Sequence, residues 1–596
     1  MKYTLGQRVF LITALALAGP ARIPRARGGM TFLRHPEEAA PQYLNTRPGV
    51  NFVGSEACAS CHKEIFDQFS KTGMGRSMSL PGALSQLEKV PKPVAVYDKQ
   101  IDRYFEVFRQ GSSLYQSEYA LDSVGRDVFR HTEEIAFVVG TGENGFSYLV
   151  QRGDYLFQAP LSFYSATGSW DLSPAHELGF DRPIVGGCVF CHSGQPQPVF
   201  NRNGLYRRPP FRELAIGCER CHGPGQLHVE ARTAGALVQG NIDLSIVNPA
   251  RLPGWLADNI CMQCHELGDA RVLQPGKDFL DFRPGAPLNE TLALFKAPMR
   301  RGRGTESPLL NHYYLMTLAK CYRASRGAMA CITCHNPHQQ PSPEKSADYY
   351  RQKCFRCHTN GSCALPLTTR LRESPPNNCV GCHMPKESVR PISHSVLTDH
   401  RIVISGDEPY PDAAFENPGS AALIHLNAEP GKDQSRVPAL TMLLAYGELR
   451  DIDSAYEQRY AELLEQVGRT AKDSVEVLDL LARRELENPA RPNSAEAIQE
   501  LSRAVQLGST WPLDYDLLGL LLERAGRFPE AISVLERGIA LDPYMSSSYT
   551  TLAACYRSTR RRNEADQTLQ EGLKLFPGDP EMRSLLRNLE SEQQLP

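Results

Sequence analysis

The chain has 596 residues, enough for two to four domains, and its formal net charge is only −2, from 65 basic and 67 acidic side chains. This balance excludes the strongly basic surface of a typical nucleic-acid-binding protein. The 17 cysteines are more informative, because 14 of them fall into one repeated pentapeptide.

The N-terminus has the pattern of a secretory signal peptide over residues 1–18. Lys2 and Arg8 come before an apolar run of ten residues, 9–18. This run ends in an Ala-Leu-Ala cleavage site. Ten apolar residues are too few to span a bilayer, so an uncleaved membrane anchor is the weaker alternative. We therefore expect an exported bacterial protein, periplasmic or on the cell surface, in which residues 19–50 form a lead-in rich in Pro, Arg and Gly.

Seven copies of Cys-x-x-Cys-His, numbered here motifs 1 to 7 in chain order, lie between residues 58 and 383. They are Cys58-Cys61-His62, Cys188-Cys191-His192, Cys218-Cys221-His222, Cys261-Cys264-His265, Cys331-Cys334-His335, Cys354-Cys357-His358 and Cys379-Cys382-His383. This is the attachment signal of c-type haem, in which two thiols bond to the haem vinyl groups and the His ligates the iron. Zinc ribbons and thioredoxin-like redox pairs are the alternatives, but neither requires a His directly after the second Cys. The sequence predicts seven covalently attached haem c groups.

These motifs define a haem domain over residues 51–400, with one long interruption. Residues 63–187 form a gap of 125 residues between motifs 1 and 2. Short runs rich in Val, Tyr and Phe, separated by Gly turns, predict an antiparallel β subdomain at about residues 90–165. The other six motifs follow at short intervals among many Pro and Gly residues, so we expect a mixed fold that is otherwise loop-rich and mainly α.

The last quarter of the chain has a different composition. Residues 401–435 are polar with Pro and Gly, which indicates a linker, whereas residues 436–596 show helical spacing of Leu and Ala. A 34-residue period is visible, since Tyr515, Ala531 and Pro543 recur as Tyr549, Ala565 and Pro577. This period and pattern predict tetratricopeptide repeats, an all-α solenoid whose concave face commonly binds proteins. The alternative is a helical cap on the haem domain.

Six-coordinate iron needs a second axial ligand, and the haem domain contains seven further histidines, one for each motif. They are His131, His176, His228, His312, His338, His394 and His400. His338 follows His335 by three residues and His228 follows His222 by six, too close to reach the opposite face of the same haem. Each is therefore predicted to ligate a neighbouring haem, with a structural role as the alternative for every one of the seven.

Four of the motif segments resemble a known family. They are GSEACASCH (residues 54–62), CERCHGPGQLH (218–228), CITCHNPH (331–338) and CVGCHMP (379–385). They are similar to multihaem cytochromes of the cytochrome c-554, hydroxylamine oxidoreductase and pentahaem nitrite reductase superfamily, over about residues 50–400. The resemblance implies that His228 and His338 serve as distal ligands of neighbouring haems, and one subgroup of the superfamily also carries tetratricopeptide repeats.

The chain departs from this resemblance after motif 1. Relatives often have a His where this chain has Met74, so Met74, or less favourably Met78, is a candidate thioether ligand that would give the first haem His/Met coordination. A packing role for the Met is the alternative. The Cys-x-x-Cys-Lys variant of the nitrite reductase active haem is absent from the sequence.

Three cysteines lie outside the motifs. Cys321 and Cys363 either form a disulfide, as an oxidising compartment allows, or remain free thiols. Cys555 is predicted to pack as a small apolar residue in the first helix of its repeat.

The supply of distal histidines favours electron transfer along a chain of mostly bis-His haems, with the repeats docking a redox partner protein. The alternative is an oxidoreductase that acts on a small nitrogen or sulfur compound at one haem lacking its sixth ligand. A scaffold whose repeats recruit other proteins is the third hypothesis, and the seven motifs argue against it.

Overall fold

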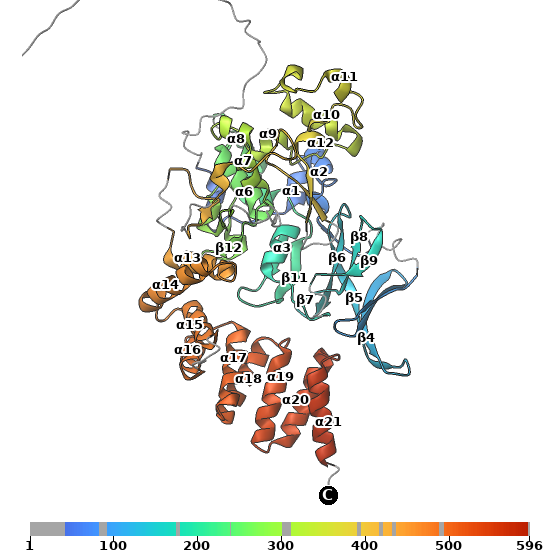
Figure 1. Cartoon of the computed structure of the whole chain (residues 1–596), viewed down its shortest axis with the longest axis vertical. Helices are drawn as coiled ribbons and strands as arrows, with labels where there is room; N and C mark the ends of the chain where they lie inside the picture. The colour runs from blue at the N-terminus through green and yellow to red at the C-terminus, as the bar shows by residue number, and fades with distance from the viewer. Residues whose placement is uncertain are drawn as a thin grey trace, which may run out of the picture.

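The computed structural model describes residues 42–82, 92–174, 179–238, 240–300, 311–389, 395–415, 421–431, 437–487 and 494–593. The predicted signal peptide and most of the predicted lead-in lie outside these residues. Figure 1 shows three parts: a region of short helices that carries the Cys-x-x-Cys-His motifs, a β subdomain beside it, and a helical array below both. None of the described helices is long and apolar enough to cross a membrane.

The β subdomain is a nine-stranded antiparallel sheet with the order β2-β3-β4-β5-β6-β8-β9, to which β1 adds on β5 and β7 on β6. Its strands are β1 (Met78–Ser79), β2 (Val94–Asp98), β3 (Arg103–Gln110), β4 (Ser113–Leu121), β5 (Asp127–Val139), β6 (Gly145–Arg152), β7 (Tyr155–Gln158), β8 (Leu161–Tyr164) and β9 (Ser169–Leu172). The alternation read from the sequence determines the faces: Phe105 and Val107 of β3 are fully buried, whereas the alternate residues Tyr104 and Glu106 are not. The expected antiparallel sheet is confirmed, and its last strand runs to Leu172.

Regular structure is sparse in the motif region. Its helices are α1 (Ser55–Ala59), α2 (Lys63–Phe69), α3 (Gly186–His192), α4 (Glu219–His222), α5 (Gln226–Thr233), α6 (Gly254–His265), α7 (His312–Leu318), α8 (Lys320–Ala324), α9 (Cys331–Cys334), α10 (Pro343–Cys354), α11 (Leu367–Arg370) and α12 (Cys379–His383). Each motif lies in, or at one end of, one of these helices. Because residues three apart share a helix face, the two thiols of a motif point to the same side.

Three small antiparallel sheets complete this region. Their strands are β10 (Gln195–Pro198) with β11 (Tyr206–Glu213), β12 (Ala270–Leu273) with β13 (Leu292–Lys296) and β16 (Ile424–His425), and β14 (Lys386–Val389) with β15 (Ser395–Thr398). Part of the expected linker at residues 401–435 is thus a strand, because β16 pairs with β13 through Phe295 and His425.

The C-terminal array consists of antiparallel helix hairpins. Its helices are α13 (Ala439–Leu449), α14 (Ser454–Thr470), α15 (Val475–Glu487), α16 (Ser494–Gln506), α17 (Pro512–Arg524), α18 (Phe528–Leu541), α19 (Ser546–Ser558), α20 (Arg562–Leu575) and α21 (Pro580–Gln593). Small residues set the helix spacing: a Cβ on Gly519 would lie 2.4 Å from the Leu535 side chain. Cys555 is fully buried in α19, which confirms its predicted packing role.

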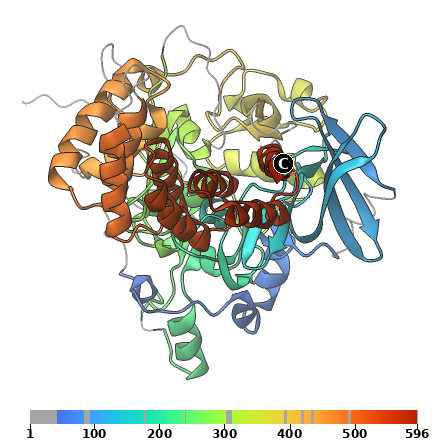
Figure 2. The ribbon, with the colours of Figure 1, turned by 90° about the horizontal axis from the view of Figure 1, so that it is seen from below.

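Both ends of the array are anchored to the rest of the chain. At its start, Leu443 and Tyr446 of α13 share an apolar cluster with Val272 of β12. Between α18 and α19, the Tyr544 ring lies 4.8 Å from the rings of both Tyr155 and Phe157, and at the far end Arg583 of α21 donates a hydrogen bond of 3.1 Å to Val128 O. Figures 1 and 2 show that the later repeats run beneath the β subdomain, so the array is both a repeat solenoid and a brace between the two other parts.

Candidate haem-binding site

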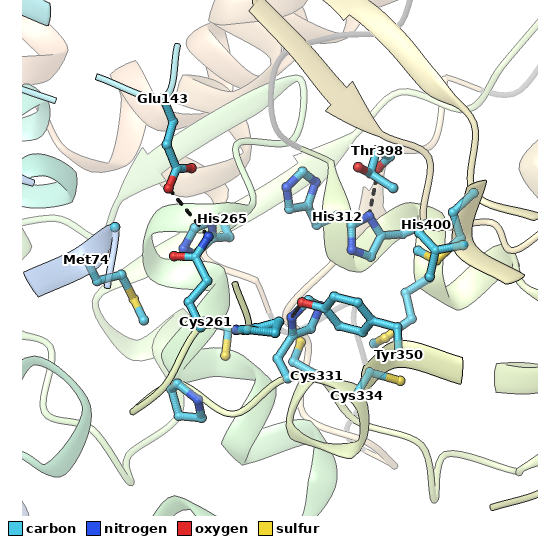
Figure 3. A pocket seen from close by; sticks show the side chains of 18 of the residues that line it. Met74, Glu143, Cys261, His265, His312, Cys331, Cys334, Tyr350, Thr398 and His400 are labelled. Atoms are coloured by element: carbon cyan, nitrogen blue, oxygen red, sulfur yellow. Dashed lines mark hydrogen bonds between the residues drawn. The ribbon is translucent and has the colours of Figure 1, made fainter. Parts of the chain in front are cut away.

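A cavity of 1920 Å³ runs through the motif region and reaches the β subdomain. Cysteines or histidines of motifs 2, 4, 5, 6 and 7 line it, together with Cys221 of motif 3. Its volume exceeds the roughly 300–1,000 Å³ of a site for one small ligand. The cavity therefore has room for more than one macrocycle beside the thiols that would hold them (Figure 3).

Four motif histidines each face a histidine from another segment. The ring centroids and interplanar angles are 6.4 Å and 20° for His62 and His228, 5.8 Å and 8° for His222 and His338, 6.1 Å and 17° for His265 and His312, and 6.3 Å and 31° for His335 and His400. A metal bonded at about 2 Å to one nitrogen of each ring places the two ring centres about 6 Å apart. Each pair therefore has the separation of two axial ligands of one iron, and the planes are nearly parallel in three pairs and tilted by 31° in the pair of His335 and His400.

The outer nitrogens of three of these rings, and of His383 in motif 7, are already held. His222 Nδ1 lies 2.8 Å from Val247 O, His228 Nδ1 3.0 Å from Asp243 Oδ2, His383 Nδ1 2.7 Å from Val403 O, and His400 Nδ1 2.8 Å from Thr398 O. A carbonyl or carboxylate oxygen only accepts, so in the neutral ring Nδ1 carries the hydrogen and Nε2 keeps its lone pair. This is the tautomer that ligates a metal through Nε2.

Burial keeps several of these rings in that neutral form. Burial, with a smaller contribution from neighbouring histidines, lowers the pKa of His312 to about 3 and that of His335 to about 4. Burial also lowers the pKa of His222, His265 and His400. At neutral pH these imidazoles are therefore uncharged, as metal ligation requires.

Thiols from different motifs also meet. Cys58 of motif 1 lies near Cys218 of motif 3, Cys191 of motif 2 near Cys264 of motif 4, and Cys261 of motif 4 near Cys331 of motif 5, so that each raises or lowers the pKa of the other thiol. Cys221 likewise lies near Cys261, and Cys354 near both Cys334 and Cys379. Motifs 1, 3, 4, 5, 6 and 7 are thus neighbours in that order, and motif 2 lies to the side of motifs 3 and 4, with Arg220 donating to Phe190 O at 2.8 Å.

The remaining predicted ligands are placed differently. His176 and His394 lie outside the described residues. His131 belongs to β5, where its Nε2 lies 2.9 Å from Glu133 Oε1 and its ring 5.1 Å from that of Phe180; it is not among the residues that line the cavity. Among the described residues, no histidine ring pairs with those of His192, His358 or His383 in the manner of the four pairs above.

Met74 lies elsewhere than the sequence led us to expect. His228, and not Met74, faces His62 of motif 1. Met74 instead lines the cavity, and its side chain points into it (Figure 3). Met78 is 3% exposed and packs in an apolar cluster with Val189, which is the packing alternative for that residue.

One residue of the site was not predicted, and one open alternative is decided by the structure. Asp243 orients His228, although nothing in the local sequence distinguishes this carboxylate from other surface acids. Cys321 and Cys363 both line the cavity as free thiols, so the disulfide alternative is not the one in the structure.

Comparisons with known proteins identify two segments. Residues 324–362 match the family model "Doubled CXXCH motif", and residues 522–589 match the model "Tetratricopeptide repeat". No curated protein matches the sequence. The first match covers motifs 5 and 6 and indicates covalent haem c; the second confirms the repeats.

Several solved structures are similar to part of the chain. The crystal structure of MamA is 22% identical, with 23% of this chain and 78% of that chain covered and a TM-score of 0.21. The Arabidopsis OM64 TPR domain is 15% identical, with 20% and 95% covered and a TM-score of 0.19. The second TPR domain of human RPAP3, in complex with an HSP70 peptide, is 17% identical, with 20% and 98% covered and a TM-score of 0.19. From the two family matches, this protein combines paired c-type haem-binding motifs with tetratricopeptide repeats in one chain.

Proposed function

We propose that this protein is an exported electron carrier, in which seven covalently attached haems form a conducting chain and the repeats bind a redox partner. The four facing histidine pairs carry this proposal. When both axial positions of an iron are taken by imidazoles, no position is left for a substrate, and its chemistry is reduced to accepting and passing an electron.

The contacts between motifs support a continuous path. Burial is the main cause of the lowered pKa of His222, and His338, His62 and His228 lie close enough to lower it further when protonated. His312 is affected in the same way by His265, His335 and His400. Motifs 1 and 3 thus make one close group and motifs 4 and 5 another, and the contact between Cys221 and Cys261 joins the groups.

Export follows from the signal pattern at residues 1–18 and from the haem chemistry, because bacterial c-type haem is attached outside the cytoplasm. The repeats suit a docking role, since stacked helix hairpins present an extended concave surface to a partner protein.

Low-temperature EPR of the oxidised holoprotein, with haem counted by mass spectrometry, tests the proposal. We expect seven haems and only low-spin ferric signals. Fewer haems, or a predominantly high-spin spectrum, would contradict an electron chain of saturated irons.

A second candidate function has one specific observation in its favour. His192 of motif 2 faces no described histidine ring, and the cavity that it lines also has polar lining residues from the β subdomain and the segment that follows it, among them Gln158, Ser162 and Arg182. An open haem there would be the place for an oxidoreductase acting on a small nitrogen or sulfur compound. A single high-spin haem that binds cyanide in the wild-type protein would favour this candidate.

A further inference from the structure

We infer that Met74 is the distal axial ligand of the haem attached through motif 2, opposite His192. The inference rests on the proposed function to the extent that it requires a haem on Cys188 and Cys191. It gives the branch haem His/Met ligation, whereas four haems on the main path have two imidazoles.

Met74 is free for this role because motif 1 does not use it. The ring of His228 takes the position opposite His62, and Asp243 holds His228 through Nδ1. Met74 would therefore serve a haem other than the nearest one in sequence, just as His228 and His338 each face a motif other than the one they follow.

The segment around Met74 packs against the elements that carry motifs 2 and 3. Met74 begins a 3-10 helix, η2 (Met74–Arg76). Just after it, Ser77 Oγ accepts a hydrogen bond of 3.0 Å from Ile216 N. The next residue, Met78, shares an apolar cluster with Val189, which lies between the two thiols of motif 2.

The backbone that presents Met74 is closely held. Thr72 Oγ1 donates to Phe69 O at 2.7 Å and accepts from Gly75 N at 3.1 Å, so the residues on either side of Met74 are tied together. A Cβ at Gly75 would lie only 2.3 Å from Phe69 O, which makes glycine necessary there. A side chain presented by so constrained a turn is preorganised, as an axial ligand must be.

Met74 and motif 2 share one cavity. Met74, Cys188, Cys191 and His192 all line it, and the thioether points inward (Figure 3). Within the described residues no imidazole competes for the position opposite His192. The shared cavity, the inward direction of the Met74 side chain and the packing of Ser77 and Met78 all support the same placement. They put the Met74 thioether, a soft neutral ligand, on the side of the motif 2 haem opposite His192.

Ligation by Met74 would change the reduction potential of the haem on motif 2. A thioether stabilises the ferrous state relative to imidazole, so His/Met ligation raises the reduction potential of a haem. Motif 2 lies to the side of the main path, next to motif 4 through Cys191 and Cys264 and next to motif 3, where Arg220 donates a hydrogen bond of 2.8 Å to Phe190 O. A high-potential haem at this branch accepts an electron from the path and retains it, which suits storage of one electron beside the conducting chain.

The test uses the holoprotein and three variants: Met74→Ala, Met74→His and, as a matched control, Met329→Ala, which removes another methionine of the same cavity. We expect the wild type to show the near-infrared charge-transfer band of Met-ligated ferric haem and no high-spin signal. Met74→Ala loses the band and turns one haem high-spin. Met74→His loses the band, stays low-spin and lowers the highest-potential step in a redox titration, whereas Met329→Ala matches the wild type.

Three results would overturn the inference: absence of the band from the wild type, its persistence in Met74→Ala, or appearance of the high-spin haem in His176→Ala but not in Met74→Ala. Peptide mass spectrometry separates this from failure of the proposed function. Haem present on the Cys188–Cys191 peptide with an unchanged Met74→Ala spectrum contradicts the ligand assignment alone. Absence of haem from that peptide contradicts the seven-haem chain and, with it, the inference.

Discussion

The imidazole rings of His312 and His400 stack with their centroids 4.5 Å apart and their planes at 19°. His312 begins α7 and faces His265 of motif 4, while His400 follows β15 and faces His335 of motif 5. The proposed distal ligands of two successive haems are thus in contact with each other. We propose that this contact marks the closest step of the electron path.

Replacing either of these histidines should open one iron without disturbing the others. We expect His312→Ala and His400→Ala each to convert one low-spin haem to high-spin, because the imidazole on the opposite face is unaffected. EPR spin quantitation checks this. His425→Phe is the control, since His425 stacks on Phe295 at 4.8 Å and faces no motif histidine. A fully low-spin His400→Ala protein would refute the pairing with His335.

The carboxylate behind His228 should tune the first haem. Asp243 accepts the Nδ1 hydrogen of His228 and so makes the ring a better donor to iron. Asp243→Asn removes that charge, and we expect a weaker distal ligand, by about 10–100-fold in affinity, and a higher potential for one haem with low-spin state retained. Spectroelectrochemistry measures the shift. The control is Glu230→Gln, which changes a carboxylate on α5, the helix that carries His228. It should leave all potentials unchanged.

The brace between the repeats and the β subdomain should depend on Tyr544. Its ring packs on Tyr155 and Phe157, and the guanidinium of Arg152 lies 5.8 Å from its centre. Since Tyr544 is only partly buried, we expect Tyr544→Ala to destabilise this contact by about 2 kcal/mol, less than for a fully buried aromatic. Limited proteolysis should then cleave the repeats earlier, while Tyr544→Phe keeps wild-type resistance. Equal cleavage rates in both variants would mean that the ring contact does not hold the array.

The repeats should also be more stable in mild acid. Burial, with a further contribution from the charge of Asp479, raises the pKa of Asp514 to about 7. The folded state therefore binds a proton that the unfolded state releases near pH 4, so stability falls as pH rises through the window from about 4 to 7 and is level above it. We expect Asp514→Asn to remove most of this dependence and to stabilise the protein at pH 8 by at least about 1 kcal/mol.

Urea unfolding followed by far-UV circular dichroism at pH 5 and pH 8 measures this effect. The control is Asp566→Asn, which changes a carboxylate that accepts from the exposed Gln570. An unchanged pH dependence in Asp514→Asn would show that another group is responsible.

Structural and chemical features that depend on a short segment of the chain could be predicted from the sequence. The seven Cys-x-x-Cys-His pentapeptides carry their chemistry within five residues, and the 34-residue period of Tyr515 and Tyr549 reports a local helix hairpin. Period-two alternation in strands such as β3 predicted the antiparallel sheet, because each side chain's face follows from its own position. Distance along the chain also established that His338 cannot serve the haem of His335.

Only the tertiary structure decided which groups meet. The sequence did not indicate that His338 faces His222, that His228 faces His62, or that Met74 reaches the cavity of motif 2, because each of these contacts joins segments far apart in the chain. The same holds for Tyr544 on the β subdomain. Local pattern determined which haem-binding groups this protein has, whereas their pairing depends on long-range packing that brings two distant side chains to opposite sides of one site.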